Sequence, residues 1–229
     1  MNAIKDKFFS IISHDLKNPA IAQRDSLQLL AENSHRLDIS TLSNYHRQLF
    51  KSASGLVDLL KNLFNWAQIQ TGRNIYQPLP FNLAHALLPD IGVIKSMAER
   101  KNITFEVQLP QPAIITGDQS MVVTIVRNLL TNAVKFTAEG GVVTLEISPD
   151  TARATCTISV TDTGAGMSEE QMQNLFRINR QQLREDTAGE KGTGLGLIVC
   201  KEFIEKHGST LHVESEAGKG SRFWFELKR

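Results

Sequence analysis

Apolar residues spaced three and four positions apart dominate the first third of the chain. This spacing predicts a helix from residue 4 to about residue 31, with one broad apolar face. A polar turn near residues 33–38 follows, and Asp38 or Ser40 is suited to cap the next helix. The second helix should end between residues 71 and 78, where a glycine and then a proline interrupt the pattern. Residues 1–72 are therefore expected to form a helical hairpin.

Two apolar stripes run side by side along the second predicted helix. The first consists of Leu42, Tyr45, Leu49, Ser52, Leu56, Leu59, Leu63 and Trp66. The second consists of Phe50, Ala53, Val57, Leu60, Phe64 and Ala67. A two-helix hairpin offers each helix only one neighbour, so it can bury only one of these stripes. We therefore expect a second copy of the chain to cover the other, in a homodimeric four-helix bundle.

The pattern changes after residue 76, where glycine, proline and β-branched residues become frequent. Helices are predicted at 82–100, 119–136, 168–176 and 195–207. Strands are predicted at 103–107, 112–116, 141–148, 153–161, 210–214 and 221–227. A turn at residues 149–151 should join two of the strands as a hairpin. Residues 76–229 are thus expected to form an α/β sandwich domain, with helices covering one face of a sheet.

Composition narrows the functional classes. The 229 residues are 41% hydrophobic, which is typical of a globular protein. A net charge of +1 gives no electrostatic reason to expect binding to nucleic acid or to an anionic membrane. No apolar run approaches the roughly 20 residues that a membrane-spanning helix needs. Cys156 and Cys200 lie in apolar runs without metal-ligand spacing, so they are expected to be buried free thiols.

His14 is the first candidate for chemistry. It projects from the polar side of the first predicted helix and is followed directly by Asp15. A histidine next to a carboxylate can be a nucleophile or a proton carrier. A lone exposed histidine is more often simply a solvated surface residue. The choice depends on the rest of the chain.

Three polar residues share one face of the predicted helix 119–136. Asn128, Asn132 and Lys135 are four and three positions apart, beside an apolar stripe. A carboxamide oxygen is a suitable ligand for Mg²⁺, and a lysine one turn further along can reach a phosphate. Taken alone, the same pattern describes an ordinary solvated helix face.

Two glycine-rich motifs follow. Asp162 ends a predicted strand and is followed by Gly164 and Gly166, so its carboxylate could accept a hydrogen bond from an exocyclic amine, although a simple turn has the same composition. Glycines before the helix at 195–207 expose backbone amides to a phosphate. Their motif is Gly192, Thr193, Gly194, Leu195 and Gly196. The polar and charged segment 177–191 between the motifs, ending at Lys191, is either a lid over phosphates or a solvated loop.

The order and spacing of these motifs resemble the sensor histidine kinases of two-component signalling. The segments that carry the resemblance are residues 9–19 around His14, residues 128–137, residues 162–166, Phe176 and residues 192–196. The resemblance covers essentially the whole chain. It implies a dimeric helical domain that receives a phosphoryl group, followed by a gyrase-type ATP-binding domain.

The resemblance also implies a role for each residue. His14 would be phosphorylated and Asp15, where many relatives carry glutamate, would orient it and accept its proton. Asn128 would ligate Mg²⁺, Asn132 and Lys135 would lie near the phosphates of ATP, and Asp162 would hold the adenine amine. The remaining nucleotide-binding residues would be Gly164, Gly166, Lys191, Gly192, Thr193, Gly194, Leu195 and Gly196.

The implied reaction is transfer of the γ-phosphoryl group of ATP to His14 and then to an aspartate of a response-regulator receiver domain. Asn18, one turn after His14, could position a water that removes phosphate from the receiver, or it could be only a polar surface residue. With only 13 residues before His14, the chain is expected to be the cytoplasmic catalytic core of a longer sensor. Two rival functions are a nucleotide-binding scaffold without kinase activity and a gyrase-like ATPase.

Overall fold

A computed structural model describes the chain except for residues 1, 34–36, 71–75, 111, 177–186 and 188–194. The chain divides into two compact units, residues 1–74 and 75–229. Within the described residues, no helix is both long enough and apolar enough to span a membrane.

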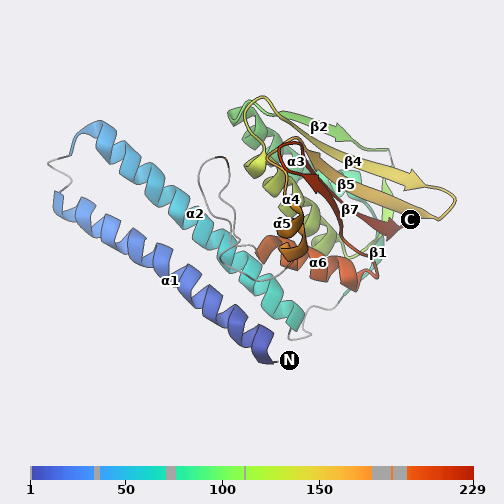
Figure 1. Ribbon diagram of the computed structural model, residues 1–229, viewed down its shortest axis with the longest axis horizontal. Helices are drawn as coiled ribbons and strands as arrows, with labels where there is room; N and C mark the ends of the chain where they lie inside the picture. Colours follow the sequence, from blue (N-terminus) through green and yellow to red (C-terminus); the bar gives the residue numbers. More distant parts are fainter. Residues whose placement is uncertain (1, 34–36, 71–75, 111, 177–186, 188–194) are drawn as a thin grey trace. The chain divides into compact units, whose positions relative to one another are not determined.

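The first unit is a hairpin of two long helices, α1 (Asn2–Asn33) and α2 (Ile39–Gln70), as Figure 1 shows. Asp38 caps α2, because its Oδ1 accepts the Thr41 N–H at 2.8 Å. Hydrogen bonds from Thr41 and then from Ser40 lower the pKa of Asp38 below its ordinary value. α1 continues through Pro19, although a proline has no N–H to donate to the carbonyl of Asp15.

The two apolar stripes of α2 have different environments. Residues of the first stripe are half-buried, since α2 packs along α1; these are Leu42, Tyr45, Leu49, Leu56 and Leu63. Residues of the second stripe are exposed: Phe50 at 76%, Val57 at 49%, Leu60 at 50% and Phe64 at 62%. A single hairpin therefore buries only one stripe, as the sequence pattern predicted.

The second unit is built on a mixed sheet, which has seven strands among the described residues. Its strands are β1 (Leu79–Asn82), β2 (Thr104–Gln108), β3 (Ile114–Gly117), β4 (Val142–Asp150), β5 (Thr155–Asp162), β6 (His212–Glu216) and β7 (Gly220–Lys228). They lie in the order β1-β3-β7-β5-β4-β2, and β6 pairs with β7. The β2–β4 pair is parallel, and the other pairs are antiparallel.

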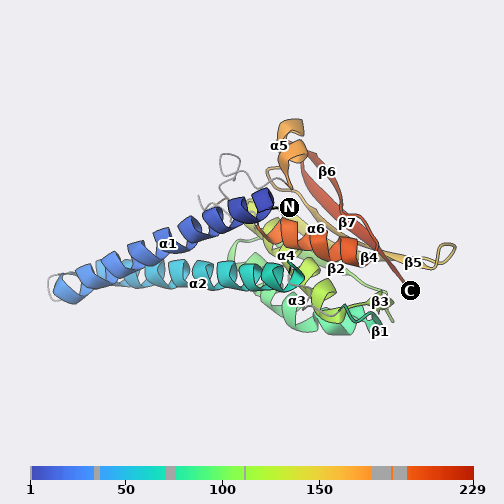
Figure 2. The same cartoon turned by 90° about the horizontal axis from the view of Figure 1, so that it is seen from below.

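Helices α3 (Leu83–Arg100), α4 (Gln119–Phe136) and α6 (Leu195–Lys206) lie on one side of this sheet, and the short helix α5 (Glu169–Asn174) lies near β6 (Figure 2). α4 packs against both α3 and α6 and lies over β4 and β5. Alternate residues of β5 face these helices and are buried, namely Cys156, Ile158 and Val160. Cys156 and Cys200 are free and buried, as expected from their apolar surroundings.

The predicted elements are present, with shifts of up to two residues at their ends. Strand β1 was not predicted, because it has only four residues and contains Pro80. Pro149 was placed in a turn but lies inside β4. β2 ends opposite Glu146, so no β2 residue pairs with Pro149 and its missing N–H disrupts no ladder on that side.

Each unit contains one of the two tryptophans of the chain. Trp66 belongs to α2, and Trp224 belongs to β7. Trp224 stacks on the His212 ring with the centroids 5.2 Å apart. The guanidinium of Arg222 lies 4.9 Å from the centre of the Trp224 ring, within the range of a cation–π contact.

Candidate nucleotide-binding site

α4 is the central element of the candidate site, and Asp118 fixes where it begins. Asp118 Oδ1 accepts the N–H groups of Ser120 and Met121, each at 3.1 Å, and Oδ2 accepts the Gln77 N–H at 3.2 Å. Burial disfavours the charged carboxylate, but a hydrogen bond from the Ser120 hydroxyl to Oδ1 at 2.7 Å, together with these amide bonds, outweighs burial and lowers the pKa of Asp118 below its ordinary value. The cap satisfies N–H groups that the first turn of a helix leaves without partners.

The predicted polar face is present on α4. Asn128, Asn132 and Lys135 are half-buried. The neighbouring Leu129 and Leu130 are buried in the core. The apolar stripe thus fixes the rotation of the helix and leaves the three polar side chains along one side.

Asn128 has an unusual environment. Its Nδ2 is buried and has no hydrogen-bond partner among the described residues. The fully buried Cys200 thiol lies beside this amide; burial raises the pKa of Cys200 to about 12, and its contact with Asn128 opposes part of that shift. A thiol is a weak acceptor, so it does not replace a proper partner for an amide N–H. A buried amide of this kind can accommodate a further polar partner, such as water or a ligand.

The last residue of the second glycine motif lies beside this amide. A Cβ atom on Gly196 would be 3.7 Å from both Cγ and Oδ1 of Asn128. The first turn of α6 therefore packs next to the middle of α4, which agrees with the contact between these two helices.

The first glycine motif contacts the C-terminal end of α4. Asp162 ends β5, is 6% exposed, and accepts the Gly164 N–H on its Oδ1 at 2.8 Å. The next amide, of Ala165, donates to the carbonyl of Phe136, the last residue of α4, at 3.2 Å. The two motifs thus contact α4 at different points, Gly196 at Asn128 and Ala165 at Phe136.

Two glycines are needed where this loop meets the turn between β6 and β7. Gly166 has a φ of +57°, and a Cβ there would overlap the carbonyl of Glu216. Gly220 has a φ of +111°, and a Cβ there would overlap the carbonyl of Asp162. Sequence reasoning missed Gly220; its signal is the closely spaced pair Gly218 and Gly220 between two strands.

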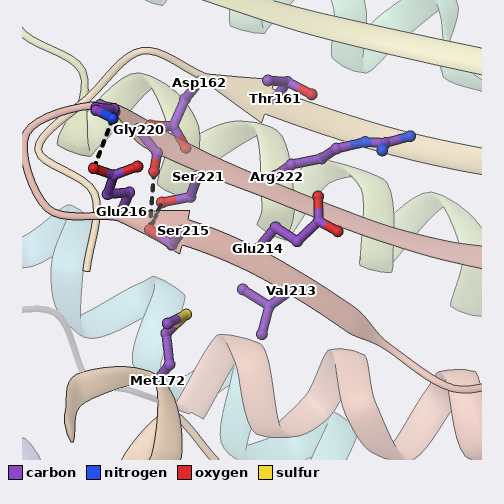
Figure 3. Close-up of a pocket in the computed structure, with 11 residues that line it drawn as sticks. Thr161, Asp162, Met172, Val213, Glu214, Ser215, Glu216, Gly220, Ser221 and Arg222 are labelled. Carbon is purple, nitrogen blue, oxygen red and sulfur yellow. Dashed lines mark hydrogen bonds and ion pairs between the residues drawn. The ribbon is translucent and has the colours of Figure 1, made fainter. Parts of the chain in front are cut away.

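An open pocket of about 500 Å³ lies where the end of β5, the β6–β7 hairpin and α5 meet. Figure 3 shows Asp162 and Ser221 on neighbouring strands, with Val213 and Met172 facing the space between β6 and α5. Asp162 therefore lines a pocket that also has apolar side chains, which suits a flat ring with an exocyclic amine. Asn128, Asn132 and Lys135 do not line this pocket.

Several predicted site residues lie outside the described part of the structure. Lys191, Gly192, Thr193 and Gly194 are among them, and only the backbone of Leu195 is described. Most of the predicted lid, residues 177–191, is also outside it. In the first unit, the side chains of His14 and Asp15 are not described, whereas Asn18 is exposed on α1.

Two further polar residues that the sequence did not single out hold α4 in place. His207 accepts the Asp118 N–H on Nε2 at 3.0 Å, and its Nδ1 donates to the Phe203 carbonyl at 2.7 Å, since a carbonyl can only accept. Lys101 lies at the other end of the helix, where its ammonium donates to carbonyls of the last turn of α4. A polar residue at the end of a predicted helix, or directly after it, gives no sequence signal for such contacts.

The residues present restrict how Mg²⁺ could be held. The described residues contain no group of three or more His, Cys, Asp or Glu side chains that could hold a metal ion. The carboxamide of Asn128 offers one oxygen ligand. Because Mg²⁺ keeps an octahedral shell of oxygen ligands, this site fits the ion only together with phosphate and water oxygens.

Residues 117–229 match the family described as histidine kinase-, DNA gyrase B-, and HSP90-like ATPase. The second unit therefore contains a region, residues 117–229, that is similar to the ATPase domains of this family. Over 233 residues the chain is 31% identical to the sensor protein GacS of Pseudomonas syringae pv. syringae, and the match covers 98% of this chain and 25% of GacS. The chain belongs among the homologues of sensor histidine kinases and spans about a quarter of that relative's length.

Two solved structures that match this fold are named as histidine kinases. Histidine kinase ThkA, in complex with the response regulator TrrA, matches with a TM-score of 0.74 and 20% identity, covering 96% of this chain and 60% of ThkA. Full-length ShkA in complex with AMPPNP matches with a TM-score of 0.64 and 23% identity, covering 92% of this chain and 45% of ShkA. These likenesses show that both units have the fold of histidine kinases.

Proposed function

We propose that the chain is the catalytic core of an ATP-dependent histidine autokinase that phosphorylates His14. The observation that carries the proposal is the arrangement around α4. The buried amide of Asn128 has no partner within the described protein, and the glycine motifs contact the helix beside it and at its end. The family of residues 117–229 and the AMPPNP complex of ShkA support an adenine nucleotide as the ligand.

Each nucleotide-site residue then has a chemical role. Asp162, which lines the open pocket, accepts a hydrogen bond from the exocyclic amine of adenine. Asn128 supplies an oxygen to Mg²⁺, whose positive charge neutralises the phosphates, and Asn132 and Lys135 lie along the same face toward the phosphate chain. The glycines at 164, 166, 192, 194 and 196, with Lys191, Thr193 and Leu195, shape the remainder of the site.

His14 acts as the nucleophile. The lone pair of one ring nitrogen of neutral His14 forms a bond to the γ-phosphorus while the bond from that phosphorus to the bridging oxygen of ADP breaks. Asp15, the next residue on α1, holds the proton on the other ring nitrogen and accepts it after transfer. The phosphoryl group then passes to an aspartate carboxylate of a receiver domain.

The exposed stripe on α2 supports a homodimer. Phe50, Val57, Leu60 and Phe64 lie on one side of the helix and are about half or more exposed in the single chain. An apolar stripe of this length is costly to leave in water. A second copy of the hairpin presents the same stripe, so the two would close a four-helix bundle with a self-complementary interface.

A response-regulator receiver domain is the proposed partner. The complex of ThkA with the response regulator TrrA supports this choice. Asn18 is exposed on α1, one turn after His14, and its neutral carboxamide can orient a water but cannot act as a base. We assign it to dephosphorylation of the receiver. We further propose that this catalytic core is cytoplasmic.

Incubation with γ-labelled ATP and Mg²⁺ tests the function directly. The wild-type chain should become labelled, His14→Ala should remove the label, and Asn128→Ala should abolish both labelling and nucleotide binding. His46→Ala is the matched control, since His46 is an exposed histidine on α2. Label that persists in His14→Ala would refute the assignment of His14. Nucleotide binding without any label would indicate a scaffold, and phosphate release without label would indicate a gyrase-like ATPase.

A further inference from the structure

Lys101 makes an unusual set of contacts. It follows directly after α3, and its Nζ lies 2.7 Å from the Val134 carbonyl, 3.2 Å from the Lys135 carbonyl and 3.0 Å from the Thr137 carbonyl. It also donates to the Thr187 hydroxyl at 2.7 Å. The three protons of an ammonium are thus shared among four protein oxygens.

These contacts lie where α4 most needs a donor. The last four carbonyls of a helix have no intrahelical partner, and the partial negative charge of the helix gathers there. Lys101 provides both hydrogen bonds and a positive charge, although it comes from the end of a different helix. The ammonium of Lys101 donates its protons to protein oxygens, whereas the ammonium of Lys135 is proposed to bind a phosphate.

The same end of α4 supports the first glycine motif. Lys101 bonds to the carbonyls of Lys135 and Thr137. The carbonyl of Phe136, which lies between these two in the chain, accepts the Ala165 N–H at 3.2 Å. A Cβ on Gly164 would overlap this Phe136 carbonyl, so the loop and the helix end are in close contact. Any displacement of the last turn of α4 must therefore displace the loop that follows Asp162.

We propose that Lys101 is a positioning residue of the nucleotide site: it holds the last turn of α4 where the asparagine-bearing helix meets the first glycine motif. The role rests on the proposed function, because it concerns the distance between the phosphate-facing residues on α4 and the adenine-facing Asp162. The contacts of Lys101 with α4 are to backbone carbonyls and not to the side chains proposed to face the phosphates. It acts through the carbonyls of Val134, Lys135 and Thr137.

A measurement without nucleotide tests the structural half of the proposal. In nitrogen–proton NMR spectra of the full chain, Lys101→Met should shift the amide resonance of Ala165, and Lys101→Arg should restore most of its position. Lys95→Met is the control, since Lys95 is an exposed lysine on α3. It should leave Ala165 unchanged. An Ala165 resonance that is the same in Lys101→Met and wild type overturns the proposal.

Nucleotide titration tests the functional half. Lys101→Met should weaken binding of a non-hydrolysable ATP analogue about tenfold, a change typical of a lost charged interaction. Lys101→Arg should bind within a few-fold of wild type, and Lys95→Met should equal it. Ile115→Ala, in a fully buried position of β3, controls for stability. It should lower the melting temperature and keep the affinity.

The outcomes separate this inference from the proposed function. Equal weakening by Lys101→Met and Ile115→Ala at similar loss of melting temperature overturns the positioning role, because general stability would then explain both. Wild-type affinity in Lys101→Met also overturns it. A wild-type chain that fails to bind the analogue refutes the proposed function itself, while the Ala165 resonance still reports whether Lys101 holds α4.

Discussion

Individual polar side chains in the second unit act mainly on backbone groups. Asp118, Asp162, His207 and Lys101 each bond to amides or carbonyls that secondary structure leaves without partners. Such bonds cost little conformational entropy at the backbone, which is already ordered, and their loss leaves buried polar groups unsatisfied. Single residues therefore set the ends of α4, on which the candidate site depends.

Replacing Asp118 should show how one carboxylate stabilises the second unit. Asp118→Ala removes the cap of α4 and the acceptor for Gln77, and should destabilise the domain by about 1–2 kcal/mol. The lowered pKa of Asp118 means that its contribution is fully present above the unfolded pKa, near 4, and is lost as the pH falls through the folded value.

Urea unfolding between pH 7 and pH 2.5 checks this prediction. The difference in unfolding free energy between wild type and Asp118→Ala should be constant near neutrality and shrink below about pH 4. Glu99→Gln, at an exposed position of α3, is the control variant. A difference that stays constant to pH 2.5 would exclude ionisation of Asp118 as its source.

The buried thiols should be unreactive. Burial raises the pKa of Cys200 to about 12 and also raises that of Cys156, so neither forms the reactive thiolate near neutral pH. Alkylation at pH 8 followed by mass spectrometry should leave the folded chain unmodified and modify two thiols in urea. Rapid labelling of Cys200 in the folded state would contradict its burial beside Asn128.

At the scale of the element, the bounds of a helix were predicted best where its cap, its apolar periodicity and its last residues favour the same positions. Helix α4 occurs at the predicted 119–136, because an Asp118 cap, an amphipathic pattern and Thr137 at its end all favour these bounds. Strand β1 was not predicted from the sequence. Its four residues form a strand because they pair with β3, and their own composition does not favour one.

The sequence shows the candidate residues of the site but not the contacts that join them. The spacing of Asn128, Asn132 and Lys135 and the two glycine motifs are visible in the sequence. The bond from Ala165 to Phe136, the contact of Gly196 with Asn128 and the reach of Lys101 to α4 join positions far apart in the chain. Hydrophobic periodicity carries no information about such contacts.

Two glycines in different elements should respond in opposite ways to alanine. Gly92 lies within α3 with nothing within 4 Å of its missing Cβ, so Gly92→Ala should stabilise the unit by about 0.5–1 kcal/mol. Gly166→Ala should destabilise it by at least about 1–3 kcal/mol, because of its positive φ and the overlap with Glu216. Thermal unfolding followed by circular dichroism measures both changes, and the same sign for both would contradict the backbone argument.

At the scale of the whole molecule, the two units differ in what they can bury alone. The second unit encloses a core between its sheet and α3, α4 and α6. The hairpin leaves one stripe of α2 in water. Its stability should therefore depend on association, whereas that of the second unit should not.

The double substitution Phe50→Ser and Phe64→Ser should convert a dimer to a monomer. Both side chains are more than 60% exposed in the single chain, so their replacement removes little intramolecular packing. Analytical ultracentrifugation at micromolar concentration should show wild-type dimers and variant monomers. Leu88→Ser with Val93→Ser, which alters exposed apolar residues of α3, should leave the dimer intact. A wild-type chain that sediments as a monomer would refute the four-helix bundle.

The division of the two tryptophans between the units gives the molecule a built-in optical reporter for each. Trp66 belongs to the hairpin and Trp224 to the sheet of the nucleotide domain. Trp66→Phe leaves fluorescence from the second unit alone, and Trp224→Phe leaves that of the first. Emission during dilution or denaturation can then distinguish loss of the hairpin from loss of the domain.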